Sequence, residues 1–403
     1  MKPSVGDRLD LEITKVVHGG YGLGRRDGYV VFVKGALPGE QVSVEIRDAK
    51  KSHGFADLIE VTQASPHRVD HVWPEASHTR AVAERAGGAD YGHIERGYQL
   101  TLKAEVIYQS VERFSPASIL EMVPSEVRAI DDDPSGLHWR TRVSLHVNEA
   151  GRAGPYAEGS HTVVETATLP LATEDINSLG VHRQDWAGHR QIRLVHSAHT
   201  SPRIVVDDQK PTTIEETVAG HVFHLSDQGF WQVHRNAAEA LFTLTRDRLS
   251  VLDLSPGEQH LDLYAGVGLF SRAVTDAAKG DVPLISVEAD NLASEYAAQN
   301  LADLNKSQTV SSRVDRFLRH FEPTKPLGAV VLDPPRSGAG RDVIDALALL
   351  RPRAVIYIAC DPVALARDLS HFHEHGYSAT AWDALDLFPH THHVESVVVL
   401  ERT

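Results

Sequence analysis

The chain has 403 residues, a formal net charge of −15, 42% hydrophobic residues and 24% charged residues. This length suits two or three domains of a soluble globular protein. The acidic balance excludes a protein that coats nucleic acid by charge alone, but it allows a local RNA-binding face. A single cysteine excludes an internal disulfide and any multi-cysteine metal site. Neither a signal peptide nor a membrane-spanning run is recognisable, so we expect a cytoplasmic protein.

The first 62 residues alternate short strand patterns with tight turns. Arg8–Ile13, Tyr29–Val33 and Gln41–Arg47 have the spacing of strands, and His18–Arg26 is a glycine-rich turn. The pattern predicts a small β-barrel of the OB type, although an SH3-like module fits the composition equally well. These segments resemble a TRAM domain, a small RNA-binding barrel that is fused to enzymes that modify tRNA and rRNA.

Residues 63–215 carry the weakest pattern and are predicted to be a central α+β domain. Leu100–Phe114 has helical spacing, and Trp139–Val147 alternates like a strand that carries Arg140 and Arg142. Arginines on a strand usually mark a solvated face. The functional alternative is contact with RNA phosphates.

Residues 216–403 alternate strands with helices, which predicts a Rossmann-like, mostly parallel, doubly wound sheet. The whole chain is therefore expected to be a multidomain α/β protein. Ligands of such sheets bind at the carboxyl ends of the strands. Strands are expected at Gln259–Tyr264, Leu284–Glu288, Ala329–Asp333, Ala354–Ala359 and from Glu395 onward, with helices at Phe270–Ala278, Asn291–Leu304 and Val343–Leu350.

A G-x-G turn, Gly266 to Gly268, follows the first of these strands. Alone it can hold a dinucleotide, a nucleoside or nothing. Two details favour S-adenosylmethionine: the third glycine of the dinucleotide fingerprint is missing, and Glu288 ends the next strand, where a carboxylate can accept both ribose hydroxyls. The alternative for Glu288 is a surface charge at a strand end. Asp315 is a weaker candidate neighbour of the adenine, and nothing local marks Gln232 as functional.

The next two strands end in reactive groups. Asp333 is followed by Pro334 and Pro335, which stiffen the loop and fix the carboxylate at the rim of the crevice. An aromatic residue after the two prolines would suggest amino methylation of a flipped adenine, but Arg336 stands there. Cys360 lies between a strand and a helix, where we expect a lowered thiol pKa and a nucleophile. The alternative is a small buried hydrophobe.

The last motif, Phe388–Glu395, contains three histidines and a glutamate. We do not interpret it as a metal site, because histidine is common throughout the chain. Glu395 begins an apolar final strand, and a carboxylate at such a position can have a raised pKa and act as a general base.

Taken in order, these motifs resemble the RNA 5-methyluridine methyltransferase family. The resemblance is strong over residues 220–403, includes the TRAM barrel and is loose between them. It rests on Phe230–Val233, Asp262–Phe270, Asp333–Arg336, Cys360–Pro362, Leu365–Asp368, Phe388–Thr391 and His393–Glu395. It implies S-adenosylmethionine as the cofactor, contacted by Gln232, Tyr264, Glu288, Asp333 and less certainly Asp315, with Cys360 as the nucleophile and Glu395 as the base.

The reaction that this resemblance implies is methylation of uracil C5 through a covalent bond between Cys360 and C6. RNA is the implied partner, with 23S rRNA favoured over tRNA because of the fused barrel, and no oligomer is implied. Two alternatives stay open. One is an amino methyltransferase (N6-adenine or N2-guanine) that uses Asp333, Pro334 and Pro335. The other is an RNA-binding protein with an inactive methyltransferase domain.

Two departures from the family pattern matter. Many members carry a four-cysteine iron–sulfur site after the barrel, but residues 71–90 contain no cysteine here, so no cluster and no metal are expected. Leu269 stands where relatives often have asparagine, and it cannot make the side-chain hydrogen bond that asparagine would make.

Overall fold

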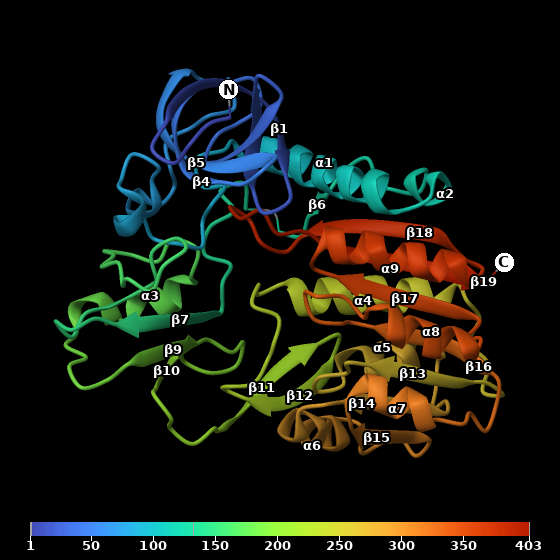
Figure 1. Ribbon diagram of the computed structural model, residues 1–403. Coiled ribbons are helices and arrows are strands. Elements are labelled where there is room, and N and C mark those ends of the chain that lie inside the picture. Colours follow the sequence, from blue (N-terminus) through green and yellow to red (C-terminus); the bar gives the residue numbers. More distant parts are fainter. Residues whose placement is uncertain (1, 132, 403) are drawn as a thin grey trace.

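The structure is a computed structural model that describes residues 2–131 and 133–402. It consists of an N-terminal barrel, a small antiparallel sheet and a large mixed sheet covered by helices (Figure 1). No helix within the described residues is long and apolar enough to cross a membrane.

Five strands close into the predicted barrel in the order β1-β2-β3-β5-β4. They are β1 (Arg8–Val17), β2 (Tyr21–Arg26), β3 (Tyr29–Lys34), β4 (Gln41–Ala49) and β5 (His53–Gln63). The predicted turn over His18–Arg26 is partly wrong, because β2 occupies most of it. A Cβ atom on Gly22 would lie 2.6 Å from the carbonyl oxygen of Ala36, so this glycine permits close packing in a strand as well as a turn.

The middle of the chain contributes to two different layers. A four-stranded antiparallel sheet has the order β10-β9-β7-β8. Its strands are β7 (Arg142–Val147), β8 (Ala153–Gly154), β9 (Gln191–Val195) and β10 (Arg203–Val206), and three short helical turns (Pro74–Ala76, Val82–Glu84 and Val181–Arg183) and helix α3 (Glu174–Ser178) surround them. The predicted strand over Trp139–Val147 starts later than expected, because Arg140 instead forms isolated bridges to His234 and Ala172.

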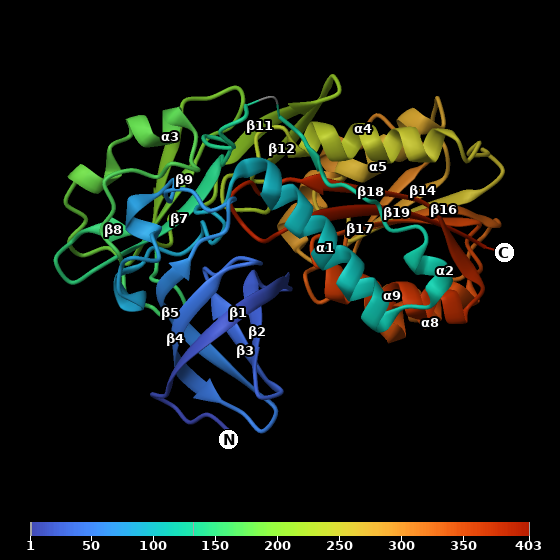
Figure 2. The same ribbon diagram turned by 90° about the horizontal axis from the view of Figure 1, so that it is seen from above.

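Helix α1 (Arg96–Phe114) confirms the predicted helix and begins four residues earlier. It packs along α9 (Pro362–Glu374) of the C-terminal part, as Figure 2 shows. Helix α2 (Ala117–Leu120) follows, and β6 (Arg128–Ala129) then pairs with the edge of the large sheet. Residues from the middle segment thus complete the C-terminal layer.

The large sheet has eight strands in the order β15-β14-β13-β16-β17-β19-β18-β6. In this order, the strands from β15 to β17 pair in parallel as predicted, whereas β19 runs antiparallel to both of its neighbours. The strands are β13 (Gln259–Leu263), β14 (Leu284–Glu288), β15 (Ser307–Ser311), β16 (Leu327–Leu332), β17 (Ala354–Ala359), β18 (Tyr377–Asp386) and β19 (Glu395–Arg402). The hairpin of β11 (Thr213–Val218) and β12 (His221–Ser226) precedes it and crosses residue 215, so the division into 1–62, 63–215 and 216–403 stays a prediction.

Helices cover both faces of this sheet. One apolar cluster joins the sheet to α1, α7 (Val314–His320), α8 (Arg341–Leu349) and α9. A second joins the opposite face to α4 (Ala237–Ser250), α5 (Leu269–Ala277) and part of α6 (Asn291–Asn300). Apolar runs such as β16 and β17, in which every residue is buried, explain why the sheet forms at the centre of these two layers.

Candidate active site

A cavity of about 1010 Å³ opens at the carboxyl edge of the parallel strands. Leu263 of β13 lies beside Leu332 of β16, so Tyr264 and Asp333, which follow them, emerge at the same edge. Both residues line the cavity. The predicted placement of ligand-binding groups at the strand ends agrees with this geometry.

Cys360 and Glu395 meet across the neighbouring pair of strands. Ala359 at the end of β17 is the register partner of Ser396 in antiparallel β19. The next residue outward on each strand is Cys360 on one side and Glu395 on the other. Both line the cavity, Cys360 half-buried and Glu395 only 4% exposed.

Six of the seven site residues expected from the sequence line this cavity: Gln232, Tyr264, Glu288, Asp333, Cys360 and Glu395. Asp315 does not. Its carboxylate, in the first turn of α7, accepts hydrogen bonds from the side chains of Arg313 and Arg319 at 3.0 Å each. The carboxylate of Asp315 therefore bonds to a residue of its own helix and to the residue before that helix.

The glycine turn is built around the carboxylate of Glu288. One oxygen accepts the backbone N–H of Gly266 at 2.9 Å, and the other accepts that of Asp290 at 2.7 Å. Tyr264 and Gly266 have positive φ values of 67° and 54°, so the chain turns sharply where β13 ends. Nothing lies within 4 Å of a Cβ atom added to Gly266, so the backbone of the turn faces open space in the cavity.

A buried carboxylate that the sequence interpretation did not single out supports this turn. Asp262 is 0% exposed, and its Oδ2 accepts a 2.6 Å hydrogen bond from Ser271, while its Oδ1 has no partner among the described residues. Burial raises the pKa of Asp262 to about 7. The signal in the sequence was one acidic residue between two leucines in the strand that leads into the glycine turn, Gln259–Leu263.

The carboxyl groups of Asp333 and Glu395, which line the cavity near Cys360, have raised pKa values. Burial and repulsion from Asp262 raise the pKa of Asp333 to about 7. Burial, with a smaller contribution from Asp333, raises the pKa of Glu395 well above its ordinary value, and Arg336 opposes that shift. The raised pKa expected for Glu395 therefore agrees with its surroundings.

The expected lowering of the Cys360 pKa is wrong. Burial, followed by the negative charges of Glu395 and Asp333, raises the pKa of this thiol to about 12, and Arg336 only partly opposes the rise. Helix α9 does begin just after the cysteine, but its N-cap is Asp361, whose carboxylate accepts the N–H groups of Val363 and Ala364. The effect of burial, which raises the pKa of Cys360, is therefore larger than the effect of the helix N-terminus, which would lower it.

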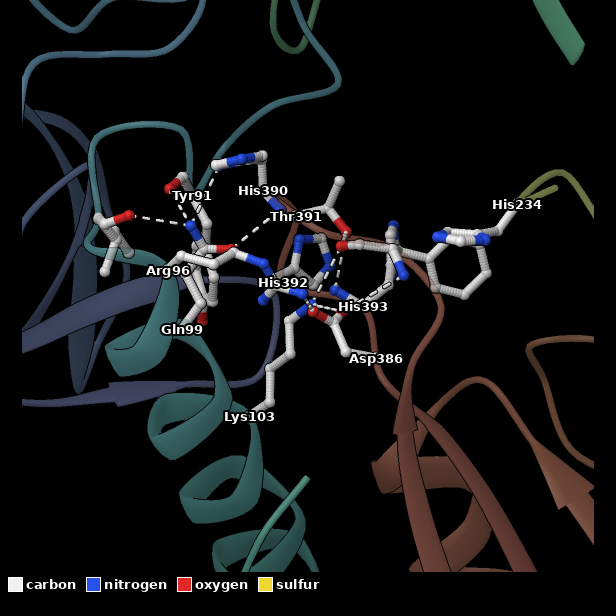
Figure 3. Close-up of polar contacts among 12 residues, drawn as sticks. Tyr91, Arg96, Gln99, Lys103, His234, Asp386, His390, Thr391, His392 and His393 are labelled. Carbon is white, nitrogen blue, oxygen red and sulfur yellow. Dashed lines mark hydrogen bonds and ion pairs between the residues drawn. The ribbon is translucent and has the colours of Figure 1, made fainter. Parts of the chain in front are cut away.

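A buried ion pair fixes the loop that leads into Glu395 (Figure 3). The Lys103 ammonium of α1 lies 2.6 Å from the carboxylate of Asp386, and both side chains are 0% exposed. Arg96 lies 2.5 Å from the same carboxylate, and Lys103 also donates to the carbonyl oxygen of Phe388 at 3.0 Å. Helix α1 thus holds the chain where β18 ends.

The three histidines of this loop have different hydrogen-bonding partners, although the rings of His392 and His393 also contact each other, with 4.1 Å between their centroids. The backbone N–H of His390 donates to Gln99 at 2.9 Å, as the contacts in Figure 3 illustrate. His392 pairs with Asp90 at 2.6 Å, and His393 lies 3.3 Å from Arg336. Within the described residues, no group of three or more histidine, cysteine, aspartate or glutamate side chains is arranged to hold a metal ion.

The barrel touches the site at the helix that follows Cys360. His18, in the turn between β1 and β2, lies 3.4 Å from the carboxylate of Asp361. Its ring also meets that of His392 edge-on, with 6.4 Å between the ring centroids. The N-terminal barrel is therefore in contact with both segments that frame Cys360 and Glu395.

Comparisons with known proteins agree with this architecture. Residues 192–403 match the family model tRNA (Uracil-5-)-methyltransferase, and residues 3–59 match the TRAM domain. An "Uncharacterized RNA methyltransferase" of Streptomyces avermitilis is 32% identical over 98% of this chain and 99% of its own length. Another from Bdellovibrio bacteriovorus is 30% identical, covering 99% of this chain and 96% of its own length.

A solved structure shares the overall fold. The tRNA (uracil-54, C5)-methyltransferase of Pyrococcus abyssi, in complex with S-adenosyl-L-homocysteine, superposes with a TM-score of 0.69 at 19% identity, covering 97% of this chain and 100% of that chain. Together with the family model, which spans more than half of the residues, and the relatives that match almost the full length, these findings establish that the chain belongs to the tRNA (uracil-5-)-methyltransferase family and carries an N-terminal TRAM domain.

Proposed function

We propose that this RNA methyltransferase transfers a methyl group from S-adenosylmethionine to C5 of a uridine through a covalent adduct on Cys360. The observation that carries the proposal is the register of β17 and β19, which sets Cys360 beside Glu395 in one cavity. A thiol and a carboxylic acid together are what this chemistry requires, because one group must add to the ring and another must remove a proton.

The residues that line the cavity near the glycine turn suit the cofactor. Glu288 is held by two backbone N–H groups with its carboxylate at the cavity wall, where it can accept ribose hydroxyls. Gln232, Tyr264 and Asp333 line the same space and would complete the contacts. The cofactor supplies a methyl group on a positively charged sulfur. Nearby carboxylates favour that charge.

The roles of Cys360 and Glu395 follow from the chemistry of uracil. Uracil C5 is a weak nucleophile, and the bond from the Cys360 sulfur to C6 breaks the C5–C6 double bond and makes C5 electron-rich. C5 would then take the methyl group from the cofactor, whose sulfur would keep the electrons of the broken sulfur–methyl bond and leave as a neutral thioether. Glu395 removes the remaining C5 proton, the double bond re-forms, and Cys360 leaves with the electrons of its bond to C6. The base must leave its stack to expose C6.

RNA containing 5-fluorouracil tests the proposal. Fluorine at C5 leaves no proton for Glu395 to remove, so an adduct with Cys360 is expected to accumulate when S-adenosylmethionine is present. On ordinary RNA, Glu395→Gln is expected to accumulate the adduct as well, whereas Glu401→Gln, at the far end of the same strand, is the matched control. Failure of the wild type to form an adduct, or an adduct that survives Cys360→Ser, contradicts the mechanism.

The same experiment distinguishes the alternatives. Methylation that persists in Cys360→Ala indicates amino methylation through Asp333, Pro334 and Pro335, and cofactor binding without turnover indicates an inactive domain. Sequencing the crosslinked RNA identifies the substrate. We retain 23S rRNA as the predicted target and tRNA as the alternative, although the barrel no longer separates them, because a protein named as a tRNA methyltransferase shares the fold over 97% of this chain.

A further inference from the structure

A second cavity, of about 380 Å³, adjoins the first. The two share Gly88, Arg140, Gln228, Gly229 and Val233 in their linings. The second cavity extends from there over the antiparallel sheet of the middle segment, next to β7 and β9. A strand of RNA with one base in the first cavity would therefore have its neighbouring groups beside the second.

Three arginines line this second cavity: Arg140, Arg142 and Arg193. Arg193 of β9 is the register partner of Ser144, which stands two residues after Arg142 in β7. Side chains two residues apart point to the same face of a sheet, so Arg142 and Arg193 share a face, while residues of both faces of β7 and β9 line the cavity. Among the described residues of the lining, Asp227 is the one acidic group against three positive charges.

Hydrogen bonds hold these guanidinium groups in place, and one nitrogen of Arg142 lacks a partner among the described residues. Arg142 donates through Nη1 to the carbonyl oxygen of Gly229 at 2.8 Å, and its Nη2 is buried without a partner among the residues described by the structure. Arg193 donates to the side chain of Gln228 at 2.8 Å. Asp227 directs its carboxylate to Thr212, accepting both the backbone N–H at 3.0 Å and the hydroxyl at 2.5 Å.

We propose that this arginine-lined cavity, formed by Arg140, Arg142 and Arg193, binds a phosphate group of the RNA strand next to the target uridine. The inference rests on the proposed function, and it adds a binding site for the backbone of the substrate. A buried arginine nitrogen without an acceptor favours an anion, and guanidinium forks match phosphate oxygens. In a chain with a net charge of −15, such a local site compensates for overall repulsion of RNA.

Arg193 is the arginine to change, because the hydrogen bonds of Arg142 to the main chain also support the loop at Gly229. We expect Arg193→Ala to weaken RNA binding several-fold. The slope of the logarithm of the binding constant against the logarithm of salt concentration should fall by about 0.7 for each single-strand phosphate that the variant no longer neutralises. Arg193→Lys keeps the charge and should keep most of the slope. The KM for RNA should rise, with an unchanged single-turnover rate at saturating RNA.

Arg190→Ala is the matched control, because Arg190 precedes β9 and pairs on the surface with Asp208, with 81% of its side chain exposed. Its RNA binding and salt slope should equal those of the wild type. An unchanged slope in Arg193→Ala, or an equal loss in Arg190→Ala, overturns the proposal. Binding of S-adenosylhomocysteine by each variant verifies folding, and Arg193→Gln replaces Arg193→Ala if the latter does not bind it.

The outcomes separate this inference from the proposed function. Absence of a 5-fluorouracil adduct in the wild type contradicts the function itself. An adduct that forms normally, together with an unchanged salt slope in Arg193→Ala, overturns only the phosphate site.

Discussion

The raised pKa of Cys360 gives a quantitative prediction that a single-cysteine protein makes easy to measure. Alkylating agents react with the thiolate, and a pKa of about 12 instead of the ordinary thiol value of 9.0 lowers the thiolate fraction about 1000-fold at pH 8. Because Cys360 is the only cysteine, all label found on cysteine reports on this one site.

The assay is the rate of iodoacetamide labelling, followed by mass spectrometry, in native protein and in the denatured chain. We expect native protein without ligands to react about 1000-fold more slowly than the denatured chain at pH 8. Restricted access to a half-buried thiol also slows labelling, but its effect does not depend on pH. The native rate should therefore rise about tenfold per pH unit up to at least pH 10.

Two variants test the physical cause. Arg336→Ala removes the positive charge that opposes the rise and should slow labelling further, whereas Glu395→Gln removes a negative charge and should speed it at pH values where Glu395 is ionised. A native rate that levels off between pH 7 and pH 9 would refute the reasoning, because it would mean that the helix end, rather than burial and the carboxylates, sets the thiol pKa.

Three further predictions concern stability. The pKa of Asp262 is higher in the folded protein than in the unfolded chain. Its ionisation therefore lowers the free energy of unfolding progressively from about pH 4 to pH 7, by up to ~4 kcal/mol. Asp262→Asn should raise the melting temperature more at pH 8 than at pH 4. Asp386→Asn leaves the buried Lys103 and the partly buried Arg96 without a carboxylate and should cost ~3–5 kcal/mol in denaturant unfolding. The cost should exceed that of Lys103→Met, after which Arg96 still pairs with Asp386. Asp361→Ala removes the N-cap of α9 and should cost ~1 kcal/mol by the same measurement, whereas a neutral result would mean that His18 and the cap bonds carry no stability.

The hydrophobic pattern of the sequence was sufficient to predict the bounds of strands in which nearly every residue is buried. The expected bounds of Leu284–Glu288 and Ala354–Ala359 match β14 and β17, because continuous apolar runs between glycine- and charge-rich segments have few other interpretations. The chain order of these strands predicts that Asp333 and Cys360 share an edge of the sheet. Glu395 was expected beside them only from the family resemblance, because it begins its strand and reaches this edge through the antiparallel direction of β19.

Contacts between distant segments could not be predicted in this way. Lys103 and Asp386 are 283 residues apart, and nothing near either one indicates that α1 supports the loop before Glu395. Gly22 illustrates a local error, because glycine is typical both of turns and of strands that another backbone approaches closely. The Arg142–Arg193 pair likewise depends on the register of β7 and β9, which a single sequence does not fix.

The raised pKa of Cys360 bears on the order of steps in the proposed reaction. The thiolate of Cys360 and the carboxylate of Glu395 repel each other in a buried cavity, so the protein disfavours having both charged at once. The thiol proton must pass to water before Cys360 adds, because a pKa of about 12 keeps the sulfur protonated. Bond formation from Cys360 to C6 then converts the thiolate into a neutral thioether and moves the negative charge onto the ring. That step removes one of the two neighbouring charges before Glu395 must act as a base. The electrostatics of the cavity therefore favour the order in which addition precedes proton removal, and they keep the lone thiol protonated, and so resistant to oxidation, until then.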